Sequence, residues 1–422
     1  MTVAGPSTNE SFFQTPDFWL LLTSNASATF ASRALAVVVG YQVYEITNNP
    51  LSLGLLGLVE AIPALSLALF GGHVADRYER RQILRITLAV LALCAAALAG
   101  LAASSEHGLA LGALYSIVFV AGIARGFAEP AAIALEAQIV PLQFMVKSAA
   151  WFASTWLICA VTGPVFGGIM LTFAGAAPTY LAFAVLYSIA CVAATRLSPR
   201  PVLPGPHGES IWQSIGAGVR YVTRNEVLLG SMALDLFAVL FGGAIAILPV
   251  VAKEILQVGP IALGFLNAAP HAGALVTMLI ATRHPPVRHA GRNLLIAVAG
   301  FGVSMIVFAF STNFFLSLAA LTLSGVCDGV SVVIRRTIVR VLSPDALRGR
   351  IAAVSMVFVG SSNELGALES GVAASLFGVV PSLFGGGVLT LVVVGLTTIL
   401  APKLRRLNLD EEASKASKTP AI

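Results

Sequence analysis

Long apolar segments separated by short polar breaks limit most strongly how this chain can fold. Several run 18 to 25 residues with at most one charged residue, which matches the roughly 20 residues that an α-helix needs to cross a bilayer. Charged residues make up 11% of the 422 positions, whereas a soluble chain carries about 25%. Lipid must therefore replace water around this protein. The sequence lacks the short segments of alternating polarity that a membrane β-barrel needs.

The apolar segments predict an all-α membrane protein with twelve transmembrane helices. The breaks between them contain turn-forming residues, such as Asn48-Asn49-Pro50 and Ser343-Pro344-Asp345. The predicted spans are 18–46, 51–74, 84–103, 108–138, 147–173, 178–197, 227–254, 259–281, 293–311, 314–342, 350–378 and 381–402.

The basic residues predict the orientation in the membrane. Of the 25 Lys and Arg residues, Arg33 and Arg125 lie within spans and only Lys253 borders an outer loop. The others lie in, or border, the loops on one side and the C-terminal tail. By the positive-inside rule that side is cytoplasmic, and both termini are expected there. The first 17 residues are polar and indicate no cleavable signal peptide.

The longest polar break divides the chain into an N-terminal six-helix bundle (1–197) and a C-terminal one (227–402). The cytoplasmic linker (198–226) opens Pro-rich and continues as a predicted amphipathic helix, and a cytoplasmic tail (403–422) ends the chain. Either an interfacial helix or a plain solvated linker fits this composition. An interfacial helix would present the apolar Ile211, Trp212, Ile215 and Val219 opposite Arg220 and Arg224.

An internal repeat supports two pseudo-symmetric halves. Segments 122–141 and 325–344 both run from Gly to Pro, and the same offset of 203 aligns Lys147 with Arg350 and Gly163 with Gly366. A small slip, to 207, aligns the Glu-Ala-Ile-Pro of 60–63 with the Asn-Ala-Ala-Pro of 267–270. Two repeated six-span halves are the architecture of many secondary transporters.

Charges within the spans indicate a polar interior. A charge at the bilayer centre costs about 2.5–3.5 kcal/mol on insertion scales, so it is usually buried and functional. The third, sixth, ninth and twelfth spans have none in their apolar interiors, which predicts that they face lipid while the others surround a central cavity. The ionisable residues inside the other spans are Arg33, Glu60, Arg125, Glu129, Asp235, His271, Asp328, Glu364 and Glu369.

Two interpretations of these residues stay open. Carboxylates in a poorly hydrated cavity can bind and release protons during transport, and the candidates nearest mid-span are Glu60, Asp235 and Asp328, followed by Glu129, Glu364 and Glu369. Alternatively they form structural ion pairs, including one between Arg125 and Glu129, four residues apart on one helix. Arg33 and Arg125 would bind an anionic substrate group or hold a carboxylate. Six carboxylates against two arginines suit either a cationic substrate or a proton-coupled cycle.

No reactive constellation points to an enzyme, a metal or another cofactor. His271 is the only mid-span histidine, and a hydrogen-bonded core histidine explains it better than a ligand. Cys94, Cys159, Cys191 and Cys327 lie scattered in apolar spans, without disulfide or metal spacing, and are predicted to pack as small apolar residues.

The loop after the second span has a distinctive motif, Gly-Gly-His-Val-Ala-Asp-Arg-Tyr-Glu-Arg-Arg, beginning at Gly71. Positive-inside anchoring explains its arginines but not the Gly-x-x-x-Asp-Arg ahead of them. The motif resembles the signature G-x-x-x-D-R-x-G-R-[RK] of the major facilitator superfamily, with Glu79 in place of the usual Gly. The matching residues are Gly72, Asp76, Arg77, Arg80 and Arg81.

Two further segments carry the resemblance, which extends over nearly the whole chain. Segment 343–351 and the variant loop are similar to the bacterial enterobactin (siderophore) exporter subgroup. Gly163, Pro164, Gly167 and Gly168 are similar to the helix-packing motif of proton-coupled exporters.

This resemblance implies alternating access by a rocker-switch, in which Asp76 and Arg77 belong to a cytoplasmic gate. We therefore expect a monomeric secondary transporter in the bacterial inner membrane, without nucleic-acid partners, that exports a siderophore-like or drug-like small molecule against protons. The alternatives are a carrier of another solute class, such as a lipid or metal ion, and a non-transporting receptor.

Overall fold

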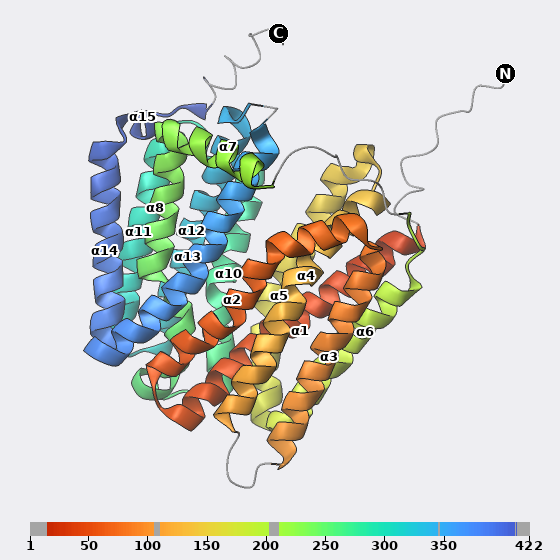
Figure 1. Cartoon of the computed structure of the whole chain (residues 1–422). Helices are drawn as coiled ribbons and strands as arrows, with labels where there is room; N and C mark the ends of the chain where they lie inside the picture. Colours follow the sequence, from red (N-terminus) through yellow and green to blue (C-terminus); the bar gives the residue numbers. More distant parts are fainter. Residues whose placement is uncertain (1–14, 105–109, 202–210, 345–346, 410, 412–422) are drawn as a thin grey trace, which may run out of the picture. The chain divides into compact units, whose positions relative to one another are not determined.

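The computed structural model describes residues 15–104, 110–201, 211–344, 347–409 and 411. Every regular element in these ranges is a helix (Figure 1), so the predicted all-α class is confirmed. Each predicted span corresponds to a helix, or to a run of helices for 227–254, within four residues at either end.

The chain divides into two compact units: Met1–Val39 with Val59–Gly205, and Gly40–Leu58 with Pro206–Ile422. The division after Gly205 falls inside the predicted linker, but the second unit also takes in the end of the first helix and the start of the second. Within it, Tyr44 donates a hydrogen bond to Glu254 (3.1 Å) and Lys253 donates one to Asn48 (3.0 Å).

The first six long helices form the first unit, except for residues 40–58 at the end of the first helix and the start of the second, which belong to the second unit. Among them, α3 packs on α4 and α6, and α5 packs on α6. The helices are α1 (Pro16–Thr47), α2 (Pro50–Arg77), α3 (Arg80–Ser104), α4 (Leu111–Ile139), α5 (Met145–Ala174, after the 3-10 turn Leu142–Phe144) and α6 (Ala176–Arg196).

The second unit packs α12 against α10 and α11, and α14 against α11 and α8. Asn225 and Asn313 begin α8 and α12, because each side chain accepts two of the backbone N–H groups that a helix start leaves unpaired. The remaining helices are α7 (Ile211–Arg224), α8 (Glu226–Gly242), α9 (Leu248–Val250), α10 (Pro260–Arg283), α11 (Ala290–Phe310), α12 (Phe314–Leu342), α13 (Arg348–Phe377), α14 (Val379–Leu400) and α15 (Pro402–Arg405).

Nine helices in the described ranges are long and apolar enough to cross a membrane. Three more, α1, α2 and α13, are 32, 28 and 30 residues long and correspond to the other predicted spans.

The seventh span is not the single helix that hydropathy predicts. After Gly242, α8 gives way to a 3-10 turn (Ala244–Ile247), the short α9 and a π-helical turn (Val251–Ile255). Gly243 leaves the helical region, with φ −73° and ψ 66°. Pro249 has no N–H for a helical hydrogen bond, so it fits at the start of α9.

The packing in the two units repeats the sequence offset. Gly122 of α4 lies against Pro63 of α2, where an added Cβ would stand 2.8 Å from the proline ring. At the equivalent place in the second unit, Gly325 of α12 lies against the Pro270 carbonyl of α10. Gly175 and Gly378, also 203 apart, end α5 and α13 with φ of 81° and 91°, a conformation that glycine adopts without steric cost.

Two short helices, α7 and α15, lie across one end of the second bundle (Figure 1). Tyr221 of α7 donates a hydrogen bond to the Leu342 carbonyl (3.1 Å), and Val222 is fully buried. Val219, on the predicted apolar stripe, lies at the protein surface and is 38% exposed. The side chains of 211–215 lie outside the described residues.

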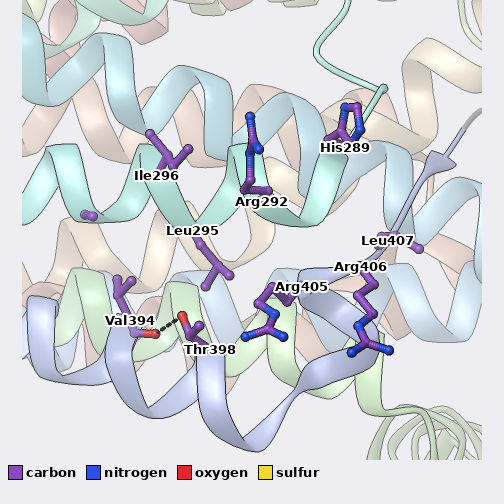
Figure 2. A pocket seen from close by; sticks show the side chains of 10 residues that line it. His289, Arg292, Leu295, Ile296, Val394, Thr398, Arg405, Arg406 and Leu407 are labelled. Carbon is purple, nitrogen blue, oxygen red and sulfur yellow. Dashed lines mark hydrogen bonds between the residues drawn. The ribbon is translucent and has the colours of Figure 1, made fainter.

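At the same end, α15 docks on the start of α11 (Figure 2). Leu404 is fully buried, and Gly291 lies against its carbonyl. Backbone hydrogen bonds join Gly291 to Leu407 and Leu409 to Val287, both at 3.3 Å.

Candidate functional site

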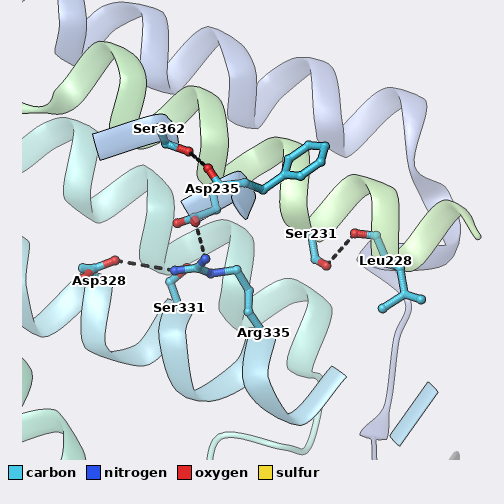
Figure 3. Close-up of polar contacts among 8 residues, drawn as sticks. Leu228, Ser231, Asp235, Asp328, Ser331, Arg335 and Ser362 are labelled. Atoms are coloured by element: carbon cyan, nitrogen blue, oxygen red, sulfur yellow. Dashed lines mark hydrogen bonds and ion pairs between the residues drawn. The ribbon is translucent and has the colours of Figure 1, made fainter. Parts of the chain in front are cut away.

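A three-residue charge network connects α8 and α12. The Arg335 guanidinium of α12 forms an ion pair with Asp235 of α8, and its other terminal nitrogen lies 3.8 Å from an oxygen of Asp328 (Figure 3). Its Nε donates a hydrogen bond to the Ser331 hydroxyl at 3.1 Å. Arg335 is thus held on three sides, and one cation serves two carboxylates.

The network differs in burial from one end to the other. The Asp235 side chain is 6% exposed, Arg335 13% and Asp328 45%. A cavity of about 10 Å³ adjoins both carboxylates, and Phe301 of α11 contributes to its lining. This volume holds about one water molecule. Asp328 is therefore the more accessible carboxylate of the two.

The sequence predicted Asp235 and Asp328 but missed Arg335, which was grouped with the basic residues bordering cytoplasmic loops. In the structure Arg335 is inside α12, seven residues before its end at Leu342. Arg335 follows Asp328 by seven residues, and residues seven apart lie on the same face of a helix. This spacing could have predicted that Arg335 lies near Asp328.

In the first unit, Arg125 of α4 forms an ion pair with Glu60 of α2. The suggested Arg125–Glu129 pair is wrong: no such ion pair forms between these two described residues, and the Glu129 residue is exposed. A partner on a neighbouring helix was available because Gly122 and Gly126 bring α4 close to α2.

Arg33 of α1 lies over an aromatic ring. Its guanidinium carbon is 4.8 Å from the ring centroid of Trp156 on α5, a cation–π arrangement. Gly163 allows this approach, since a Cβ there would stand 3.0 Å from that of Arg33. Gly167 packs in the same way against the Ala34 carbonyl, and Pro164 and Gly168 are also buried.

The remaining mid-span candidates lie on α10 and α13. Glu364 and Glu369 lie on α13, both partly buried, and Ser370 donates a long hydrogen bond to Glu369 (3.5 Å). A Glu364 oxygen lies 3.8 Å from where a Cβ on Gly57 would stand. His271 is partly buried on α10. The structure brings together only Asp235 with Asp328, and Glu60 with Arg125, among the described ion pairs.

The arginines of the gate motif bind carbonyls near helix ends. Arg80 donates to Ala75 (3.0 Å) and Ala134 (3.3 Å), and Arg81 donates to Thr195 at 2.7 Å. Ala75 and Thr195 are in the last turns of α2 and α6, where carbonyls lack intrahelical partners and a cation satisfies them well. Arg77 is exposed. The side chains at Gly72 and Asp76 lie outside the described residues, so the role predicted for Asp76 stays a prediction.

Within the described ranges, no group of three or more His, Cys, Asp or Glu residues is placed to hold a metal ion. The four cysteines are free, and Cys94 and Cys159 are buried.

A multi-span helical protein with two repeated units and buried ion pairs has the architecture of a secondary transporter. Residues 8–422 match the transmembrane secretion effector family, and the chain belongs to this family of the major facilitator superfamily. It is therefore a membrane transporter and not an enzyme.

Known proteins resemble the chain over most of its length. The enterobactin exporter EntS of Shigella boydii serotype 18 is 24% identical over 375 residues, 88% of each chain. EntS of Escherichia coli O157:H7 has the same identity and coverage.

Solved structures show the same fold. A POT family transporter in complex with 5-aminolevulinic acid superposes with a TM-score of 0.74 at 11% identity, over 92% of this chain and 96% of that one. A bacterial homolog of the human lysosomal transporter Spinster gives a TM-score of 0.70 at 14% identity, over 97% and 100%. The predicted major facilitator fold is thereby confirmed.

Proposed function

We propose that this protein is a proton-coupled exporter of small organic molecules in the bacterial cytoplasmic membrane, with both termini cytoplasmic. The observation that carries this proposal is the Asp235–Arg335–Asp328 network. Two carboxylates share one guanidinium, so the three-residue network carries one net negative charge. Excess negative charge beside the nearly buried Asp235 is costly, and a proton or a cationic substrate group that neutralises it is bound favourably.

Asp328 is the proposed exchange point of the network. It is the more exposed carboxylate, and its contact with Arg335 is the longer one at 3.8 Å. Asp235 is nearly buried and holds Arg335 in place. When Asp328 binds a proton, Arg335 pairs with Asp235 alone. When Asp328 loses the proton, Arg335 is again shared by both carboxylates.

The first unit offers groups for the substrate. Arg33 on the Trp156 face and the exposed Glu129 are the proposed contacts, whereas Arg125 and Glu60 neutralise each other. The family of secretion effectors and the enterobactin exporters support export of an amphiphilic, siderophore-like or drug-like molecule. We propose that a monomer alternates access by movement of the two units, with the Asp76 loop acting as a cytoplasmic gate.

The test uses everted membrane vesicles with enterobactin and ethidium as the two probes. We expect uptake of at least one probe when the vesicle interior is acidified, and its loss when an ionophore collapses the pH gradient. Asp328→Asn should reduce gradient-driven uptake tenfold or more while protein levels in the membrane stay equal. Arg220→Gln, an exposed change on α7, is the matched control and should transport normally. Uptake that persists without a gradient would contradict proton coupling.

A further inference from the structure

A pocket of about 590 Å³ lies between α11, α14 and α15, away from the charge network. The residues that line it change from basic to apolar along the helices (Figure 2). His289, Arg292, Arg405 and Arg406 lie toward one end, at the start of α11 and around α15. Toward the other end the lining is apolar and includes Ile296 and Val394.

The basic end carries uncompensated positive charge. Arg292, Arg405 and Arg406 are exposed, and none of them forms an ion pair with a carboxylate of the described chain. Their backbone is firmly placed, because Leu404 is fully buried and Gly291 bonds to Leu407. Lys403 adds a second anchor, since its N–H donates to Glu226 of α8 at 2.8 Å. The pocket therefore has a preformed site for an anionic group.

The apolar end excludes a small hydrophilic anion as the sole occupant. Ile296 is 59% exposed on the outside of α11, and the ninth and twelfth spans, α11 and α14, carry no charge in their apolar interiors. The ligand that matches both ends has an anionic head at the level of the membrane surface and a hydrocarbon chain running inward. Basic pockets between transmembrane helices on the cytoplasmic side bind acidic lipid headgroups in this way.

The geometry points to this pocket as a binding site for an anionic phospholipid of the cytoplasmic leaflet. His289, Arg292, Arg405 and Arg406 hold the phosphate, and the groove between α11 and α14 holds an acyl chain. The inference rests on the orientation proposed above, which places α15 in the cytoplasm, but not on the substrate or on proton coupling. Bound lipid would join α11, α14 and α15 into one body.

The test is native mass spectrometry of the purified full-length protein with added phosphatidylglycerol, and with phosphatidylethanolamine for comparison. We expect phosphatidylglycerol to bind at least tenfold more tightly. A basic side chain near an anionic surface contributes about 1 kcal/mol, or roughly fivefold in affinity. The triple variant Arg292→Gln/Arg405→Gln/Arg406→Gln should therefore lose this preference. These exposed substitutions should leave the thermal unfolding midpoint without lipid unchanged.

A control triple variant, Arg220→Gln/Arg224→Gln/Arg283→Gln, removes three exposed charges outside the pocket and should bind phosphatidylglycerol as the parent does. Equal losses in both triple variants would mean general attraction of lipid to positive charge and would overturn the site. Ala299→Leu and Ala299→Trp narrow the apolar end and should weaken binding in that order. If they have no effect and glycerol phosphate displaces the lipid, the pocket binds a soluble anion and the phospholipid assignment is wrong. Transport activity is not the readout, so failure here is distinct from failure of the export proposal.

Discussion

Arg335 illustrates what a single residue contributes inside a membrane. A guanidinium paired with one carboxylate forms a neutral pair. A guanidinium shared by two carboxylates, as here, forms a group with one net negative charge. Removing one partner of a buried ion pair is costly because the remaining charge stays buried without compensation. Arg335 is the only cation in the network, so its loss affects both carboxylates at once.

We predict that Arg335→Gln lowers the free energy of unfolding by about 3–5 kcal/mol, because the nearly buried Asp235 then loses its ion-pair partner. The double variant Arg335→Gln/Asp235→Asn should recover most of this loss, since one of the charges disappears. Thermal unfolding of the purified single and double variants forms a double-mutant cycle that measures the coupling. Additive effects of the two substitutions would show that Arg335 and Asp235 are not energetically paired.

At this scale the sequence identifies charged positions more readily than their partners. Hydropathy located Asp235, Asp328, Glu60 and Arg125, because each interrupts an apolar segment. It could not predict that Arg125 pairs with Glu60 on another helix, since that choice depends on how closely α4 and α2 approach. Arg335 was missed because an arginine in the last turns of a span looks like an ordinary cytoplasmic anchor.

At the scale of the helices, small residues determine which pairs of helices pack closely. Without a hydrophobic force between helices in lipid, close contact of backbones is a main source of association. Gly325 gives α12 such a contact with the Pro270 carbonyl of α10. Gly395 on α14 has open space where a side chain would stand, so the two glycines have different structural roles.

Gly325→Ala should therefore destabilise the protein, by about 1–3 kcal/mol, because the new methyl group overlaps the α10 backbone. The matched control Gly395→Ala should be neutral or stabilising by about 0.5–1 kcal/mol, because alanine loses less conformational freedom in a helix. Both effects are measured as shifts of the thermal unfolding midpoint in detergent. A Gly325→Ala protein as stable as its parent would mean that α10 and α12 can separate at no cost.

The helices themselves were largely predictable because about twenty apolar residues between polar breaks leave few alternatives in a bilayer. The interruption of the seventh span was not, although Gly242, Gly243 and Pro249 are in the sequence. Glycine and proline are common in continuous transmembrane helices, so their presence alone does not indicate a break. The sequence also did not predict how α7 docks on the bundle, where Tyr221 bonds to the Leu342 carbonyl of α12 and Val222 is buried.

At the scale of the whole molecule, the two units share a repeated framework but differ in charge. The offset of 203 that relates Gly122 to Gly325 also relates Arg125 to Asp328. The first unit therefore has a cation where the second has an anion, and each is paired differently, with Glu60 and with Arg335. Two units with the same framework but different charges allow one unit to bind and release protons while the other contacts the substrate.

The proposed topology places both termini in the cytoplasm, and α11 offers a direct test of it. Thr312 follows α11 at one end and His284 precedes it at the other, and both are exposed. We substitute each by cysteine in a background in which Cys94, Cys159, Cys191 and Cys327 are replaced by alanine. The positive-inside rule places Thr312 outside and His284 in the cytoplasm. In intact spheroplasts, a membrane-impermeant maleimide should label Thr312→Cys at once and His284→Cys only after permeabilisation. The reverse pattern would invert the proposed topology and move the lipid pocket to the outer leaflet.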